Sequence, residues 1–350
     1  MTWSTNYSII LGIISLSLFG SSQITYAAPF ILDNGPGDGT VSLGVNGFGG
    51  FGSFNGPDAT DAFYDPIGDP PAKTTLASTI AIRSGPGPWS PLTSGSDLFG
   101  LPFPPLPNPT IVGTPTSATS SFSSNGLNFN LVQTLTKTFS GSTLTQTYTI
   151  TNPTASKIDI DLLRYLDGDL FFDGTINDGG GHFINLDGVV ILFETDTLGT
   201  ASTPSTFVGI TSDGGSEPTN NGFEINQFPS LGNNIVNVGN PLNNLVFNDL
   251  DFPFMGFIDI PYDVSLALSH DGFSLDPGET VVYVTKTVFG DGAPEDVEID
   301  PPTEEMVGGT MFPIDAIALL IAGAQSMTWM IPITLSILGI GLVLVRKRIH

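Results

Sequence analysis

Two stretches near the middle of the chain alternate apolar and polar residues with a period of two. The apolar positions of the first stretch, 127–139, are Leu127, Phe129, Leu131, Leu135 and Phe139. The second, 143–150, alternates threonines with Leu144, Gln146, Tyr148 and Ile150. Because side chains of a strand point alternately to opposite faces, we predict a β-hairpin turning at Ser140-Gly141, with one apolar and one threonine face.

The same pattern predicts more strands on both sides of a clear turn. They lie at 158–166, 189–195, 205–211, 234–238, 262–268 and 280–289. Leu275-Asp276-Pro277-Gly278-Glu279 is a Pro-Gly turn of the kind that joins sandwich strands. No segment between the chain ends keeps a helical period. We therefore predict an all-β protein, a large antiparallel β-sandwich with its core at 125–298.

The part before this core, 28–124, is rich in glycine and proline. Residues 35–57 carry spaced aromatics at Phe48, Phe51 and Phe54. They fit either a flexible lead or an irregular first sheet. The prolines of 84–109 exclude helix and predict an extended loop. Whether 28–124 belongs to the same sandwich stays open at this point.

Apolar runs stand near both ends of the chain. The first, Ile9–Gly20, is too short to span a bilayer and is followed by Thr25-Tyr26-Ala27, so we predict a signal peptide at 1–27. The alternative is an uncleaved N-terminal anchor. The second run, 327–345, is long enough for a transmembrane helix, and a basic tail follows at 346–350.

These ends predict a single-pass protein at the cell surface. The basic tail favours a cytoplasmic C-terminus and an extracytoplasmic N-terminus. Before the span lie an acidic linker, 299–312, and an apolar membrane-proximal segment, 313–326. The alternative for the latter is one long tilted helix that includes the span.

The tail also carries a recognisable series of short motifs. They are Pro313-Ile314-Asp315, Ala318-Leu319-Leu320, Ala322-Gly323-Ala324-Gln325 and Trp329-Met330-Ile331-Pro332. This series resembles a recurrent C-terminal tail of predicted archaeal surface proteins, notably from ammonia oxidisers, and is similar to prokaryotic tripartite sorting signals. The resemblance implies a membrane or envelope address. No LPxTG-type motif precedes the span, so cleavage by a sortase-like enzyme stays an open question.

The chain is acidic because bases are scarce. Residues 29–312 hold 33 Asp and Glu against six Lys and Arg, and cysteine is absent. This balance excludes nucleic-acid binding, which needs a basic surface. It fits a cation, a neutral glycan, an envelope protein or another copy as partner. Without disulfides, the exported fold depends on its core, bound ions or assembly.

The central part resembles uncharacterised secreted β-domains that occur with C-terminal sorting signals. The resemblance rests on Thr147–Asn152, Arg164–Asp169, Phe193–Asp196 and Phe289–Pro294. The resemblance implies a secreted β-domain and does not indicate an activity. By fold analogy alone, a two-sheet super-sandwich of the sugar-mutarotase type also fits the length.

A cluster of oxygen-bearing side chains follows the strand at 158–166. Its members are Asp167, Asp169, Asp173, Asn177 and Asp178. Calcium takes six to eight oxygen ligands, so these residues are our candidate calcium site. The alternative is an ordinary acidic turn. Weaker candidates are the pair Asp249/Asp251 and the set Asp58/Asp61/Asp65, and we expect Arg164 to form a structural ion pair.

No catalytic residue is assigned from the sequence, and whether the chain is an enzyme is left open. A mutarotase-like acid–base pair would need His and Glu across a cleft. The available combinations are His182 with Glu194 or Glu224, and His270 with Glu279. No spacing selects any of them.

Two functions follow. The first is a membrane-anchored cell-surface or envelope protein with a structural or adhesive β-sandwich, for which calcium is the candidate stabilising ion. The alternative is a carbohydrate-binding or mutarotase-like carbohydrate-modifying surface protein. The alternative predicts exposed aromatics on one face, with Trp89, Tyr64 and Phe171/Phe172 as candidates.

Overall fold

The computed structural model describes most of the chain between residues 28 and 292. The described ranges are 28–55, 59–68, 70–95, 97–98, 101–102, 104–138, 141–172, 174–184, 189–196, 205–211, 222–250 and 256–292. The predicted signal peptide and the predicted transmembrane helix lie outside these residues. Among the described residues, no helix is both long and apolar enough to cross a membrane.

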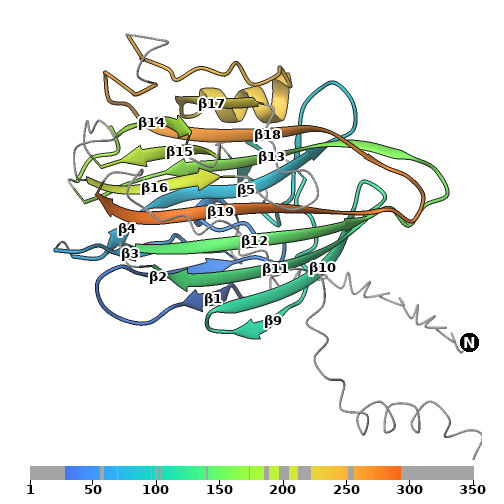
Figure 1. Ribbon diagram of the computed structural model, residues 1–350, viewed down its shortest axis with the longest axis horizontal. Coiled ribbons are helices and arrows are strands. Elements are labelled where there is room, and N and C mark those ends of the chain that lie inside the picture. Colours follow the sequence, from blue (N-terminus) through green and yellow to red (C-terminus); the bar gives the residue numbers. More distant parts are fainter. Residues whose placement is uncertain are drawn as a thin grey trace, which may run out of the picture. The chain divides into compact units, whose positions relative to one another are not determined.

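The fold is all-β and antiparallel, as predicted, and its largest layer is an eight-stranded sheet. Along this sheet the order is β14, β15, β16, β19, β12, β11, β10, β9. The strands are β9 (Ile111–Thr114), β10 (Ser117–Ser124), β11 (Leu127–Lys137), β12 (Gly141–Thr151), β14 (Gly179–Ile184), β15 (Val190–Thr195), β16 (Ser205–Thr211) and β19 (Thr280–Gly292). Figure 1 shows β19, β12, β11 and β10 running side by side.

The second layer is a five-stranded sheet in the order β17, β18, β13, β5, β6. Its strands are β5 (Thr75–Arg83), β6 (Ser90–Pro91), β13 (Ile158–Gly168), β17 (Gly222–Gln227) and β18 (Val264–Leu275). Strand β5 lies before residue 125, yet it pairs along β13 from Asp161↔Arg83 to Gly168↔Thr75. Residues on both sides of position 125 therefore build the same sandwich.

A smaller four-stranded sheet is formed by the N-terminal residues. It contains β1 (Phe30–Asp33), β2 (Thr40–Val45), β3 (Phe63–Asp65) and β4 (Ala72–Lys73). The glycine-rich segment after β2 is packed, since Phe48 and Phe51 are buried. In this segment Phe51 forms a β-bridge with Ser78 of β5. A short helix, η1 (Ser53–Asn55), and a two-stranded sheet of β7 (Asp97–Leu98) and β8 (Leu101–Pro102) complete this part.

The predicted hairpin is confirmed, with β11 and β12 as its arms. Gln133 pairs with Gln146, and the register runs from Asn128↔Thr151 to Lys137↔Ser142. Strand β11 ends at Lys137, and residues 139–140 lie outside the described part. Leu131 and Leu135 are buried while their neighbours along β11 are exposed, which is the alternation that the period of two predicts.

The predicted strand at 234–238 is wrong. These residues form a π-helical turn, η2 (Asn234–Val238), which continues from the helix α1 (Ser230–Asn233). Leu231 and Ile235 are four residues apart, so they lie on one side of the turn and both are buried. They pack with Leu163 and Tyr165 of β13. The helical spacing of two anchors therefore overrides the β-branched composition of the segment.

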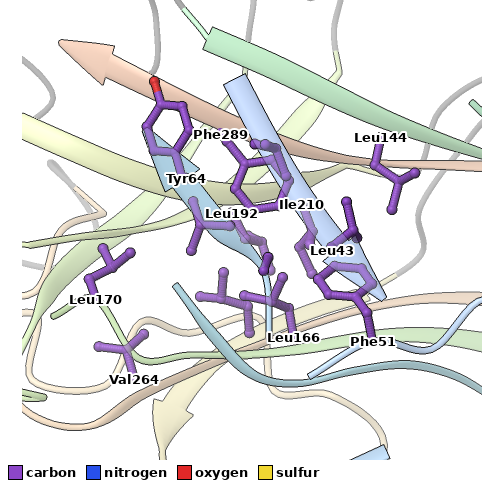
Figure 2. Close-up of a cluster of buried hydrophobic side chains, with 14 of the residues drawn as sticks. Leu43, Phe51, Tyr64, Leu144, Leu166, Leu170, Leu192, Ile210, Val264 and Phe289 are labelled. Carbon is purple, nitrogen blue, oxygen red and sulfur yellow. The ribbon is translucent and has the colours of Figure 1, made fainter. Parts of the chain in front are cut away.

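The main core fills the space between the two large sheets. Leu144, Leu192 and Phe289 enter it from the eight-stranded sheet, and Leu166 and Val264 from the five-stranded sheet. Figure 2 shows these side chains converging from strands of both layers. Burying one such Leu or Phe stabilises the fold by about 2 kcal/mol. The C-terminal end of β13, where the candidate site lies, packs against this shared core.

Candidate functional site

The end of β13 places two aspartates in contrasting surroundings. The pairing of β13 with β5 shifts register between Asp167 and Gly168. Asp167 is completely buried (0% exposed), and neither of its carboxylate oxygens has a hydrogen-bond partner in the described part of the chain. Asp169 follows the strand, and its backbone N–H donates to Thr74 O at 3.2 Å.

Three more carboxyl groups gather here from other elements. Asp178 precedes β14, Glu194 lies near the end of β15, and Asp263 precedes β18. Gly168 packs directly against Glu194, because a methyl group built on this glycine would overlap the Glu194 carboxylate. We call these residues the acidic cluster: Asp167, Asp169, Asp178, Glu194 and Asp263.

Burial raises the pKa values of four members of the acidic cluster. Burial and then repulsion from Asp263 and Asp169 raise the pKa of Asp167 well above its usual range. Burial, Asp178 and Asp167 do the same for the pKa of Glu194. Burial, Asp263 and Asp61 raise the pKa of Asp169 to about 7, although Lys73 opposes the rise. Burial raises the pKa of Asp263 to about 6. The cluster therefore binds protons near neutral pH.

Asp169 also lines a pocket of about 250 Å³. The other lining residues are Ser53, Asp61, Lys73, Thr75, Leu76 and Phe171. Lys73 Nζ lies 2.5 Å from Asp61 Oδ2, and the backbone N–H of Ser53 donates to Asp61 Oδ1 at 2.8 Å. Phe171 is 44% exposed. The pocket thus combines a fixed ion pair, an exposed aromatic ring and a carboxyl group that titrates near neutrality.

The structure brings together only part of the predicted calcium set. Asp167, Asp169 and Asp178 all lie close enough to Glu194 to raise its pKa. Asn177 is exposed, and Asp173 lies outside the described residues. Within the described residues, no three or more His, Asp or Glu side chains are grouped so that they could hold a metal ion.

Glu194 was considered only as an acid–base partner of His182, and Asp263 was not among the predicted site residues. Glu194 shares the inner face of β15 with Leu192, so an acid occupies a position that the strand period assigns to the core. That mismatch is a sequence signal for Glu194. Asp263 has no such signal, since it precedes its strand and meets Asp167 only through the pairing of β18 with β13.

The weaker acidic candidates are placed separately. Asp61 lines the pocket, whereas Asp65 lies in β3. Asp249 belongs to the segment before β18, where its backbone N–H donates to Val246 O at 3.4 Å. Asp58 and Asp251 lie outside the described residues.

The expected ion pair of Arg164 is not found among the described residues. Within the described part of the chain this fully buried side chain contacts no carboxylate. Its guanidinium donates to Thr79 O, Tyr165 O, Ser78 Oγ and Thr287 Oγ1 at 2.6–3.1 Å. Burial lowers the pKa of Arg164 to about 10. Because Ser78 and Thr287 come from different sheets, Arg164 links the two layers.

Two of the aromatic candidates are buried and do not face a cleft. Trp89 is covered by the guanidinium of Arg83, whose Cζ lies 4.0 Å from a Trp89 ring centroid. Tyr64 is in the main core, and its hydroxyl donates to Asp291 Oδ2 at 3.0 Å. Phe171 is the candidate that reaches a pocket, and Phe172 is partly buried against the core.

The histidine candidates are distributed over several places. His182 and Glu194 lie on the paired strands β14 and β15, where Gly180↔Glu194 and His182↔Leu192 put them on one face, two residues apart. Glu224 instead accepts a hydrogen bond from Asn226 Nδ2 at 2.8 Å. In the middle of β18, His270 stacks on Phe273 with ring centroids 4.1 Å apart. Glu279 lies in the exposed turn before β19.

No family model and no curated protein matches the chain. Solved structures give distant matches. A bacterial glucoamylase complexed with acarbose has 10% identity and a TM-score of 0.44 over 77% of this chain, which spans only 33% of the glucoamylase. A galactose mutarotase related enzyme from Lactobacillus acidophilus has 8% identity and a TM-score of 0.38 over 76% of this chain and 99% of its own. At these levels the matches carry no argument about activity.

Proposed function

We propose that this chain is an exported, membrane-anchored surface protein whose β-sandwich binds a neutral carbohydrate. The observation that carries the proposal is the pocket at Asp169. Its carboxyl group has a pKa of about 7, it lies beside the Asp61–Lys73 ion pair, and the exposed ring of Phe171 completes the lining.

The pocket offers the groups that sugars use. Carboxylate oxygens accept hydrogen bonds from sugar hydroxyls, and the Lys73 ammonium donates hydrogen bonds to them. The Phe171 ring provides an apolar surface for the sugar's C–H groups. A carboxyl group that titrates near pH 7 is also suited to proton transfer. The reaction that the pocket would support is reversible opening of a sugar ring. The bond between the anomeric carbon and the ring oxygen breaks, the anomeric hydroxyl loses its proton as a carbonyl forms, and the ring oxygen gains a proton.

Sugar binding is tested by calorimetric titration of the full-length chain with glucose, galactose and mannose. Asp169→Asn is expected to weaken binding of the best ligand about tenfold, as loss of a charge-assisted hydrogen bond predicts. Asp276→Asn, in an exposed turn, is the matched control and should bind normally. If no sugar binds, or if both variants bind equally weakly, the proposal is wrong. Polarimetry of α-glucose then separates binding from ring opening.

A structural or adhesive module stabilised by calcium is the second candidate. The observation in its favour is Asp167, whose buried carboxylate oxygens have no hydrogen-bond partner in the described part of the chain and whose charged neighbours include Asp263 and Asp169. A cation would compensate these charges. Millimolar calcium should then raise the thermal midpoint above its value with chelator, since a ligand at a hundredfold excess over its Kd stabilises by about 2.7 kcal/mol. No rise, or an equal rise in Asp167→Asn, would count against calcium.

The membrane anchor is tested separately from the ligand. Deleting 313–350 is expected to move the protein from the membrane fraction to the soluble fraction of a host cell, because the apolar span is removed. Deleting only 346–350 keeps the span and serves as the control. A truncated protein that still sediments with membranes would contradict this part of the proposal.

A further inference from the structure

The eight-stranded sheet has a neutral region in an otherwise acidic protein. Between Asp97 and Asp159 the sequence contains no acidic residue, and its only charges are Lys137 and Lys157. Strands β9, β10, β11 and β12 all lie in this interval. Because these strands carry no acidic residue, their outer face suits an uncharged ligand better than a cation.

A groove of about 500 Å³ lies on this face. Its lining residues are Ser121, Phe122, Ser123, Asn128, Phe129, Asn130, Thr149 and Thr151. The polar members form two rows across β10, β11 and β12. In the first row Ser121 pairs with Asn130 and Asn130 with Thr149. The second row, one strand repeat away, joins Ser123, Asn128 and Thr151.

The two rows differ in their hydrogen bonds. Ser123 donates to Asn128 Oδ1 at 2.8 Å, and the hydroxyls of Thr151 and Thr280 lie 2.8 Å apart. The side chains of the first row, Ser121, Asn130 and Thr149, form no hydrogen bond within the described residues. One row is thus internally held, and the other offers two hydroxyls and an amide to a ligand.

The sheet under the groove is packed on its core-facing side. Phe122 and Phe129 stack with centroids 4.8 Å apart and an interplanar angle of 6°, and Phe48 meets Phe122 edge-on at 4.9 Å. These rings belong to the second hydrophobic cluster of the sandwich. The polar rows are therefore carried by rigid strands and lose little entropy on binding.

From this geometry we infer that the groove binds an extended neutral polysaccharide, as a second carbohydrate site on the sheet opposite to the Asp169 pocket. The inference rests on the proposed function in that it assigns the outer body a carbohydrate ligand. A second copy of the chain fits less well. The large apolar side chains exposed on these four strands are only Val112 and Val132 among the described residues, too few for the apolar centre of a stable dimer.

Affinity electrophoresis of the full-length chain in mild detergent tests the groove. The gels contain mannan, dextran or a β-glucan, with alginate as the anionic control. At least one neutral polymer should retard the wild type, and alginate should not. The double variant Asn130→Ala/Thr149→Val should bind that polymer about tenfold more weakly, because it removes two hydrogen-bonding groups. The single variant Asn130→Asp, which adds a charge to the neutral face, should weaken binding as well.

The matched control is Thr134→Val/Thr145→Val, a cross-strand pair on the same face outside the groove. It should bind like the wild type, and thermal midpoints verify folding. Retardation by no neutral polymer, equal weakening of both double variants, or equal retardation by alginate would overturn the inference. Asp169→Asn separates the two sites: it should weaken sugar binding in the pocket about tenfold and keep polymer retardation. A failure of the pocket is then distinct from a failure of the groove.

Discussion

At the scale of single residues, burial decides what a charged side chain does in this protein. Arg164 and Asp167 are three positions apart on β13, and both are fully buried. The two terminal nitrogens of the Arg164 guanidinium make four hydrogen bonds to backbone and hydroxyl oxygens, which compensate much of its burial without a carboxylate. Asp167 has acidic neighbours, so its charge has no such compensation. The ion pair expected for Arg164 is absent among the described residues because the two side chains face different surroundings.

Arg164→Lys is expected to destabilise the fold by about 3 kcal/mol, because an ammonium cannot keep the planar set of bonds that spans both sheets. Urea denaturation of the variant measures this loss. Lys157→Arg, on the exposed turn before β13, is the control and should unfold like the wild type. An Arg164→Lys variant as stable as the wild type would show that the link between the sheets contributes little.

At the scale of elements, close backbone approach explains several strand glycines. Gly141 opens β12 opposite Gly290 of β19, where a side chain would overlap the carbonyl oxygen of Phe289. Gly209 of β16 is less crowded, since its added methyl group would lie 3.0 Å from Leu192 O. The alternation of apolar and polar residues does not reveal how closely a neighbouring backbone approaches each glycine, because glycine has no side chain.

Gly141→Ala is therefore expected to destabilise the protein clearly more than Gly209→Ala does. The expected loss for Gly141→Ala is about 2 kcal/mol or more, since backbone atoms cannot move aside without breaking the β12–β19 pairing. Thermal unfolding of the two variants gives the comparison. Equal thermal midpoints of the two variants would mean that the start of β12 rearranges at little cost in stability.

At the scale of the whole molecule, the acidic cluster couples stability to pH. The pKa values of Asp169 and Asp263 in the folded state, about 7 and about 6, are higher than the usual value of about 3.9 in an unfolded chain. The folded protein therefore binds more protons than the unfolded chain between these values. Its stabilisation by protonation is complete below about pH 4 and is lost as the pH rises through 6 and 7.

The thermal midpoint is thus expected to fall between pH 5 and pH 8. Asp167→Asn should make this fall smaller, because it removes one of the repelling carboxylates. Asp276→Asn, which changes an exposed acid, should leave the profile unchanged. A midpoint that rises over this interval in the wild type would contradict the acidic cluster as described.

The amino-acid sequence by itself determined the all-β class, the β11–β12 hairpin and the turn before β19, while its acidity stays a prediction about partners. These three features follow from side-chain period and turn chemistry, which are local properties. Tertiary structure alone decided that Glu194 and Asp263 meet Asp167, that Trp89 and Tyr64 are buried, and that 234–238 is a helical turn. The physical reason is that a strand's period fixes which face a residue occupies, whereas its neighbours on that face come from strands far along the chain, as when β13 pairs with β5 and β18.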